Sequence, residues 1–159
     1  MLKDKRSGKI AIVAHCILNQ NSRVFGLAER SSAIAEIVEF LIFNDMGIIQ
    51  MPCPELTYAG ILRKSQTKNQ YGDAMFRRHC KKTAKEIVEQ IQEYPKGKIK
   101  ARIIIGVDGS PSCGITDSGI LIEELRSMLK KKGFTVPFYG IRYERLSEDL
   151  AELGKLIKD

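Results

Sequence analysis

Residues 101–116 read Ala-Arg-Ile-Ile-Ile-Gly-Val-Asp-Gly-Ser-Pro-Ser-Cys-Gly-Ile-Thr and contain the clearest strand-and-loop pattern in the chain. The run Ile103–Ile105 is short, apolar and β-branched, as expected of a strand that a parallel sheet buries on both faces. The part that follows, Gly106–Thr116, concentrates glycine, serine and proline around Cys113. A surface turn needs no such density, whereas a loop that brings backbone and hydroxyl groups close to a bound group does. The pattern therefore predicts a buried strand over Ala101–Val107 that leads into a binding loop.

Strand-like and helix-like segments alternate on both sides of this stretch. Further strands are expected at Ile10–Ala14, Ile48–Met51 and Val136–Ile141, and helices from Ser31 or Ser32 to Met46 with a stop at Gly47, from Asp73 to Tyr94, from Thr116 to Lys132, and from Ser147 to Lys158. The segment Thr57–Tyr71 has no clear period and is expected to be an irregular lid. Such alternation predicts a parallel sheet covered on both faces. We expect an α/β chain, a single three-layer Rossmann-like domain over residues 1–159 with a parallel sheet of about four strands.

The composition is that of an ordinary globular protein, with 43% hydrophobic and 28% charged residues. No apolar run approaches the roughly 20 residues that a membrane span needs. The residues Met1–Arg6 lack the apolar segment of a signal peptide. We therefore expect a cytoplasmic protein with no membrane partner. Thiols stay reduced in that compartment, so the four cysteines indicate metal binding or catalysis before disulfides.

The formal net charge of +7 is compatible with an anionic partner such as RNA. A lysine-rich surface is the simpler interpretation, because no aromatic residues interleave with the lysines as a stacking platform would require. The residues that favour RNA are the basic ones around the expected lid, namely Arg63, Lys64, Lys68, Arg77 and Arg78.

Three of the cysteines, Cys16, Cys53 and Cys113, follow the expected strands within a few residues. The carboxyl ends of parallel strands meet at one edge of a sheet, so these thiols are expected to converge and hold one metal centre. Cys80 instead falls on the apolar stripe of the second expected helix and is expected in the core. A structural zinc site is disfavoured because it is closed by four ligands, usually in paired C-x-x-C spacing. A catalytic zinc with His15 as a ligand is disfavoured because adjacent strand side chains point to opposite faces. An iron–sulfur cubane normally takes four thiolates, so three would leave one iron open to act as a Lewis acid.

The three cysteine loops read His-Cys-Ile-Leu-Asn-Gln-Asn-Ser-Arg (15–23), Cys-Pro-Glu (53–55) and Ser-Pro-Ser-Cys-Gly (110–114). Together they resemble the thiouracil desulfidase (TudS-like) family, in the family's order, over residues 10–141. The resemblance implies a [4Fe-4S] cluster held by Cys16, Cys53 and Cys113. It also implies that the fourth iron binds the sulfur of a thiolated pyrimidine, which is hydrolysed without redox change to uracil and sulfide. The chain departs from the family pattern in the first loop, at Asn21–Gly26, and at Asp108, where the family usually has lysine nearby.

Roles for the other loop residues follow from their chemistry. Glu55 is the carboxylate expected to activate the attacking water, because it lies two residues from a ligand. Ser110 and Ser112 are expected to position that base or to donate to the developing anion. Asn19 and Arg23 are candidates for binding the pyrimidine carbonyls. His15, at a strand end, is expected to be structural.

Other functions remain open at this point. A non-enzymatic iron–sulfur protein, such as an electron carrier or a sensor, explains the cysteines but not the glutamate beside one of them. A desulfidase acting on thio-modified tRNA is the alternative to one acting on a small thiopyrimidine. A nucleotide-binding domain with chance cysteines is disfavoured, because neither G-x-G-x-x-G after the first strand nor G-x-x-x-x-G-K-[ST] is present.

Overall fold

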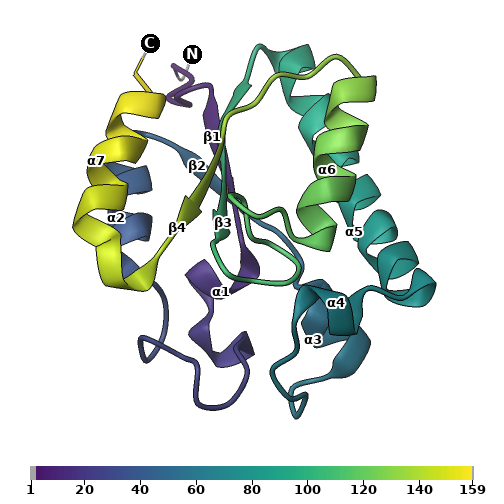
Figure 1. The fold of residues 1–159 in the computed structure, drawn as a ribbon. Coiled ribbons are helices and arrows are strands. Elements are labelled where there is room, and N and C mark those ends of the chain that lie inside the picture. Colours follow the sequence, from purple (N-terminus) through teal and green to yellow (C-terminus); the bar gives the residue numbers. More distant parts are fainter. Residues whose placement is uncertain (1–2, 159) are drawn as a thin grey trace.

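Four parallel strands form the centre of the molecule in a computed structural model that describes residues 3–158 (Figure 1). In the order β2-β1-β3-β4 they span Gly47–Gln50, Lys9–Val13, Lys100–Val107 and Phe138–Ile141. The central strands β1 and β3 carry fully buried isoleucine, valine and alanine side chains, which fits strands covered on both faces. All four predicted strands are confirmed, with ends that differ by one or two residues.

Helices cover both faces of this sheet and complete a three-layer α/β domain (Figure 1). Helices α2 (Ala35–Phe43) and α7 (Leu146–Leu156) contact each other on one face. On the other face, α5 (Ala74–Glu93) and α6 (Ile120–Lys131) form the most extensive helix pair. Their apolar sides join the sheet in a single core. No helix within residues 3–158 is both long and apolar enough to cross a membrane.

The strand order creates a crevice at the end of the sheet where the site lies. The chain leaves β1 toward β2 over one face and returns to β3 over the other, so the direction of the crossovers reverses between β1 and β3. Ligands of open α/β sheets bind at such a switch point, beyond the carboxyl ends of the strands. The register pairs Val13 with both Gln50 and Ile105. The loops after β1, β2 and β3 therefore start side by side.

Three short helices lie in segments that the sequence did not mark as helical. These are α1 (His15–Leu18), α3 (Pro54–Ala59) and α4 (Lys68–Tyr71). The irregular lid expected over Thr57–Tyr71 is therefore partly helical. Thr67 caps α4: its hydroxyl accepts a hydrogen bond from the Gln70 amide, and the Gln70 side-chain oxygen accepts one from the Thr67 amide.

Two predicted helices differ at their ends. The helix expected to stop at Gly47 ends at Phe43, and Asp45, with φ of +58°, takes the left-handed position of a Schellman motif instead. Ile42 continues the helical apolar spacing of Ile34, Val38 and Leu41, which predicts a buried side chain, but its side chain is exposed. The helix expected from Thr116 starts only at Ile120, because Asp108 accepts hydrogen bonds from the amide and hydroxyl of Thr116 and holds that residue in the loop.

Candidate metal centre and active site

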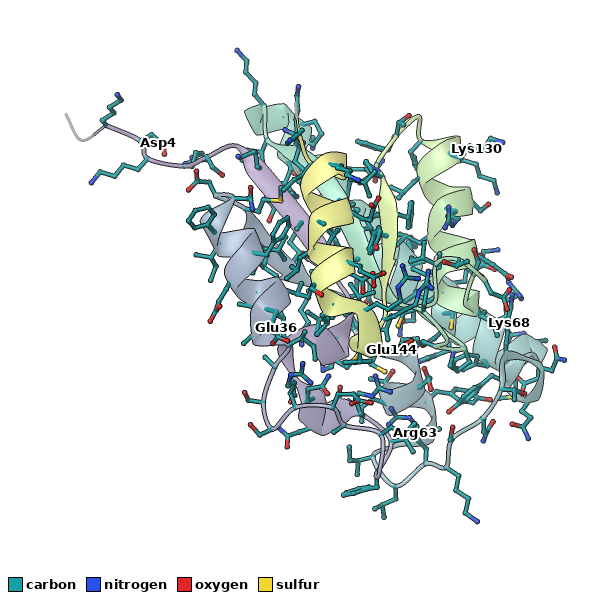
Figure 2. The ribbon with its side chains drawn as sticks, turned by 60° about the vertical axis from the view of Figure 1, so that its left-hand side comes forward. Asp4, Glu36, Arg63, Lys68, Lys130 and Glu144 are labelled. Carbon is teal, nitrogen blue, oxygen red and sulfur yellow. The ribbon has the colours of Figure 1, made fainter. Side chains whose placement is uncertain are left out.

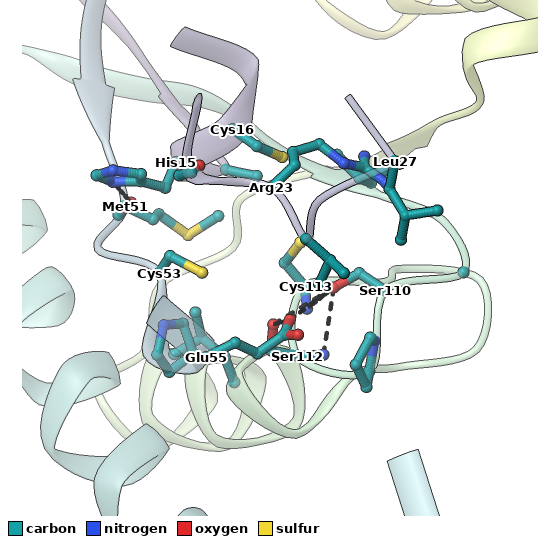
Figure 3. A pocket seen from close by; sticks show the side chains of 18 of the residues that line it. His15, Cys16, Arg23, Leu27, Met51, Cys53, Glu55, Ser110, Ser112 and Cys113 are labelled. Carbon is teal, nitrogen blue, oxygen red and sulfur yellow. Dashed lines mark hydrogen bonds between the residues drawn. The ribbon is translucent and has the colours of Figure 1, made fainter. Parts of the chain in front are cut away.

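A cavity of about 260 Å³ lies at the carboxyl ends of the strands, and the side chains of Cys16, Cys53 and Cys113 all line it (Figure 3). They reach it from the loops after β1, β2 and β3, as the topology predicts. Cys80 is fully buried in α5 and is not among the lining residues. The three loop cysteines and the core cysteine thus separate as expected from the sequence.

Local structure presents each thiol to the cavity. Cys16 lies in the first turn of α1. Cys53 is the N-cap of α3, where its sulfur accepts a hydrogen bond from the Leu56 amide at 3.4 Å, and Pro54 begins the helix. Cys113 donates its amide to the Ser110 hydroxyl at 3.1 Å.

The loop that carries Cys113 packs directly against the strand from which it departs. The Val107 amide donates to the Cys113 carbonyl at 3.2 Å. A Cβ on Gly106 would lie 2.0 Å from that carbonyl oxygen, so only glycine permits this approach. Asp108 closes the loop through the amides of Ile115 and Thr116 and lies 3.7 Å from Arg142. Burial raises the pKa of Asp108, but these hydrogen bonds and Arg142 outweigh burial and lower it. The departure from the family pattern at this position is therefore built into the loop structure.

All three cavity thiols are held in their neutral form by burial. Burial raises the pKa of Cys16, against the opposing effects of the Arg23 charge and the Tyr143 hydroxyl. Burial also raises the pKa of Cys53, opposed by the Leu56 amide, and raises that of Cys113 to about 12. Thiolates are the metal-binding form, so loading this site must displace protons.

Within the described part of the chain, no three histidine, cysteine, aspartate or glutamate side chains converge closely enough to hold one metal ion. A cluster does not require that convergence, because each thiolate binds a different iron atom at a separate corner. The donor set, three thiolates on three adjacent loops, fits a cluster with one open corner better than it fits a single ion.

Glu55 is the buried carboxylate of the cavity and lies in the first turn of α3. Its Oε2 accepts a hydrogen bond from the Ser112 hydroxyl at 2.5 Å and a longer one from the Ser110 hydroxyl at 3.5 Å (Figure 3). Ser110 in turn accepts the amides of Ser112 and Cys113, so its hydroxyl proton is free to point toward the carboxylate. The structure therefore brings all three predicted catalytic residues together, although Glu55 and Ser112 lie 57 residues apart in the sequence.

Arg63 also lines the cavity, although the sequence placed it only among the basic residues that favour RNA. Figure 2 labels it among the loops at the lower end of the molecule. Its side chain is 5% exposed, and its Nε lies 3.9 Å from Glu55 Oε1. Its Nη1 and Nη2 donate to the carbonyls of Gly60 and Ser22 at 3.1 and 2.9 Å, so it joins the lid to the first cysteine loop. No local pattern marks this arginine, because its partners lie as far as 41 residues away.

A second group that the sequence did not reveal surrounds Cys16. The Tyr143 hydroxyl accepts hydrogen bonds from Arg23 Nη1 at 2.6 Å and from Gln20 Nε2 at 3.2 Å. It lies 3.9 Å from the Cys16 sulfur. Two donors occupy the phenol oxygen, so its own proton is directed at that sulfur. Tyr143 follows β4 by two residues and is thus the contribution of the fourth strand to the site.

The two candidate substrate-binding residues are placed differently. Arg23 lines the cavity, with its guanidinium also 4.9 Å from the centre of the Tyr143 ring. Asn19 is not among the lining residues, and its side chain accepts the Asn21 amide at the start of a short 3₁₀ turn. A contact between Asn19 and the substrate stays a prediction. His15 lines the cavity, and its Nδ1 lies 3.2 Å from the Met51 carbonyl, which fits the expected structural role.

Comparison with known proteins identifies one relative across nearly the whole chain. The chain is 41% identical over 158 residues to an uncharacterized protein, MJ0003, of Methanocaldococcus jannaschii. The chain belongs to the family of MJ0003. The alignment covers 99% of this chain and 97% of the archaeal protein, so the similarity extends over the whole domain described above. No protein-family model matches the chain, and no solved structure matches it. The resemblance to thiouracil desulfidases therefore rests on the loop motifs alone.

Proposed function

We propose that this protein is a [4Fe-4S]-dependent desulfidase that removes sulfur from a thiolated pyrimidine by hydrolysis. The observation that carries the proposal is one cavity that combines three loop thiols with a buried, serine-bound carboxylate. An electron carrier needs the thiols but has no use for the carboxylate. We also propose that the protein acts in the cytoplasm, where thiols stay reduced.

The residues present fit the cluster that the family resemblance implies. Cys16, Cys53 and Cys113 would hold it, which leaves one position for an external ligand. Three thiolates give such a cluster a negative overall charge, and the guanidinium groups of Arg23 and Arg63 at the same cavity oppose that charge. When bound, the cluster would supply a Lewis acid that draws electron density from the sulfur of the substrate.

The chain's own residues supply the remaining chemistry. Glu55 accepts a proton from water as the water oxygen bonds to the thione carbon, and the C=S π electrons move to sulfur. Ser112, and Ser110 behind it, hold the carboxylate in place. When the C–S bond breaks, both protons of the water leave with the sulfur as hydrogen sulfide and the carbonyl remains. The overall reaction, ring thiocarbonyl plus water to ring carbonyl plus hydrogen sulfide, needs no oxidant or reductant.

A small thiopyrimidine suits the site better than thio-modified tRNA. The cavity, at about 260 Å³, is below the range of roughly 300–1,000 Å³ for drug-sized ligands. Two of the basic residues that favour RNA are committed to ion pairs, because Lys68 binds Glu123 and Arg77 binds both Glu123 and Glu124. Arg63 is buried. Few free cations thus remain near the lid to neutralise phosphates.

The proposal is tested by reconstituting the protein anaerobically with iron and sulfide and adding 4-thiouracil or 2-thiouracil. We expect hydrogen sulfide and uracil in equal amounts. Cys16→Ser, Cys53→Ser and Cys113→Ser should each lose cluster and activity together, whereas Cys80→Ala should keep both. A loaded cluster that releases no sulfide from any thiopyrimidine would instead favour the electron-carrier or sensor alternative. Sulfide release from thio-modified tRNA but from no free thiopyrimidine would show that the substrate is tRNA.

A further inference from the structure

The two carboxylate oxygens of Glu55 have different surroundings. Oε2 is occupied by the hydroxyls of Ser112 and Ser110. Oε1 faces Arg63, whose Nε is 3.9 Å away, which is too far for a direct hydrogen bond. One oxygen is therefore engaged by the chain, and the other keeps its lone pairs available on the side of Arg63.

Two buried polar groups lie on this open side. Arg63 Nε and the Tyr71 hydroxyl are both buried, and neither has a hydrogen-bond partner among residues 3–158. Burial and then the Glu55 charge raise the pKa of Tyr71, while Arg63 opposes the shift, so both charged groups act on this phenol. Buried polar atoms are nearly always hydrogen bonded, and ordered water is the usual partner where several of them converge.

Arg63 cannot close the gap to Glu55 by itself. Its two terminal nitrogens are fixed by the carbonyls of Gly60 and Ser22, which belong to different loops. The guanidinium is planar, so these two bonds also set the direction of Nε. The separation of 3.9 Å between Nε and Oε1 is one that a single water spans with two hydrogen bonds of ordinary length, about 2.8–3.0 Å each.

We propose that Glu55 Oε1, Arg63 Nε and the Tyr71 hydroxyl bind one ordered water, and that this water is the nucleophile. The water site rests on the separation of Glu55 Oε1 from Arg63 Nε and on the two buried polar atoms without partners, whereas its role as nucleophile rests on the proposed desulfidase function. The water accepts from Arg63 Nε–H and donates its two hydrogens to Glu55 Oε1 and to the Tyr71 oxygen. Its second lone pair then remains free for the thione carbon. Glu55 and Arg63 line the cavity while Tyr71 does not, so the phenol closes the water site from behind.

A crystal structure of the cluster-free protein tests the water site directly. We expect a density peak within hydrogen-bonding distance of Glu55 Oε1, Arg63 Nε and the Tyr71 oxygen. A direct hydrogen bond between Arg63 Nε and Glu55 with no water between them would overturn the proposal. This measurement requires no cluster and no substrate, so it is independent of activity.

Tyr71→Phe tests the role of the water, with Tyr58→Phe as its matched control. The rings of Tyr71 and Tyr58 both pack against Phe76, with centroids 4.5 and 5.1 Å away, but Tyr58 is exposed and its hydroxyl is not one of the buried atoms without a partner. The Tyr71→Phe variant loses a hydrogen-bond partner of the water, so its kcat should fall by about tenfold to 10²-fold with KM unchanged. Its Tm should fall as well. Tyr58→Phe should leave kcat and KM unchanged. A Tyr71→Phe protein with raised Tm and unchanged kcat would show a hydroxyl that binds nothing and would overturn the inference.

The failure of this inference can be told apart from failure of the proposed function. Water in the density without desulfidation would overturn the function and uphold the water site. Desulfidation by a protein that lacks this water would overturn the inference and uphold the function.

Discussion

Replacing Glu55 by glutamine separates chemistry from cluster binding, because the amide keeps the shape of the side chain but cannot take up a proton. Its oxygen can still accept the Ser112 hydroxyl that now lies 2.5 Å from Oε2. The loss of a general base at this position should lower kcat by roughly 10²–10⁴, equivalent to about 2.7–5.4 kcal/mol of transition-state stabilisation. The thiol loops should keep their geometry, so iron and sulfide content should match the wild type.

The same substitution also has a calculable effect on stability. It removes the charge opposite Arg63, whose side chain is 5% exposed and 3.9 Å away. Direct attraction at that distance is worth about 4 kcal/mol at an effective dielectric constant near 20. Part of it is recovered, because a neutral amide costs less to bury than a carboxylate. A net loss of roughly 1–3 kcal/mol would leave the protein folded, with a Tm lower by several degrees.

One preparation of Glu55→Gln gives kcat from steady-state kinetics on 4-thiouracil, cluster content from iron analysis, and Tm from thermal unfolding. Glu123→Gln is the matched control, because its carboxylate also pairs with arginine, Arg77 at 2.8 Å, but lies outside the cavity lining. That partly exposed pair is worth about 0–1 kcal/mol, and kcat should not change. Full activity in Glu55→Gln with a loaded cluster would refute the assignment of this carboxylate as the base.

Three further changes test other parts of the site. Tyr143→Phe removes the phenol that connects Arg23 and Gln20 to the Cys16 sulfur, and should speed iron loss to a chelator by about 10–100-fold; unchanged loss would reduce Tyr143 to a packing role. Gly106→Ala places a Cβ against the Cys113 carbonyl and should lower Tm strongly. Gly154→Ala in α7 is its control, because the new Cβ meets no atom within 4 Å and should not lower Tm. Equal Tm values for the two variants would contradict the close approach at Gly106. For a small substrate, KM should change little between about 50 and 200 mM salt, whereas tRNA bound through several phosphates would lose roughly 10³–10⁵ in affinity.

The strand pattern and the order of the cysteine loops were enough to predict the sheet and the gathering of three thiols. β-Branched runs mark buried strands locally, and the parallel topology then places Cys16, Cys53 and Cys113 without knowledge of any contact. Even the pairing of Glu55 with the serines follows from loops that start at the ends of β2 and β3, the two strands on either side of β1.

What the sequence did not reveal depends on contacts made by the folded chain. Tyr143 reaches Arg23 across 120 residues, and Arg63 reaches Ser22 across 41, so no window of sequence carries either signal. The helices α1 and α4 have four residues each, too few for a period to be detected. The turn after α2 uses Asp45 rather than the expected glycine, since aspartate also tolerates the left-handed conformation.

We propose that three thiolates hold a cubane whose remaining iron is open to the sulfur of the substrate. The decisive measurement is Mössbauer spectroscopy of the anaerobically reconstituted Glu55→Gln variant before and after addition of 4-thiouracil, because this variant slows turnover and keeps binding. We expect a [4Fe-4S] spectrum in which a single iron site changes when the thiopyrimidine binds. A spectrum that does not respond to the thiopyrimidine, or iron bound equally well after all three cavity cysteines are replaced by serine, would contradict it.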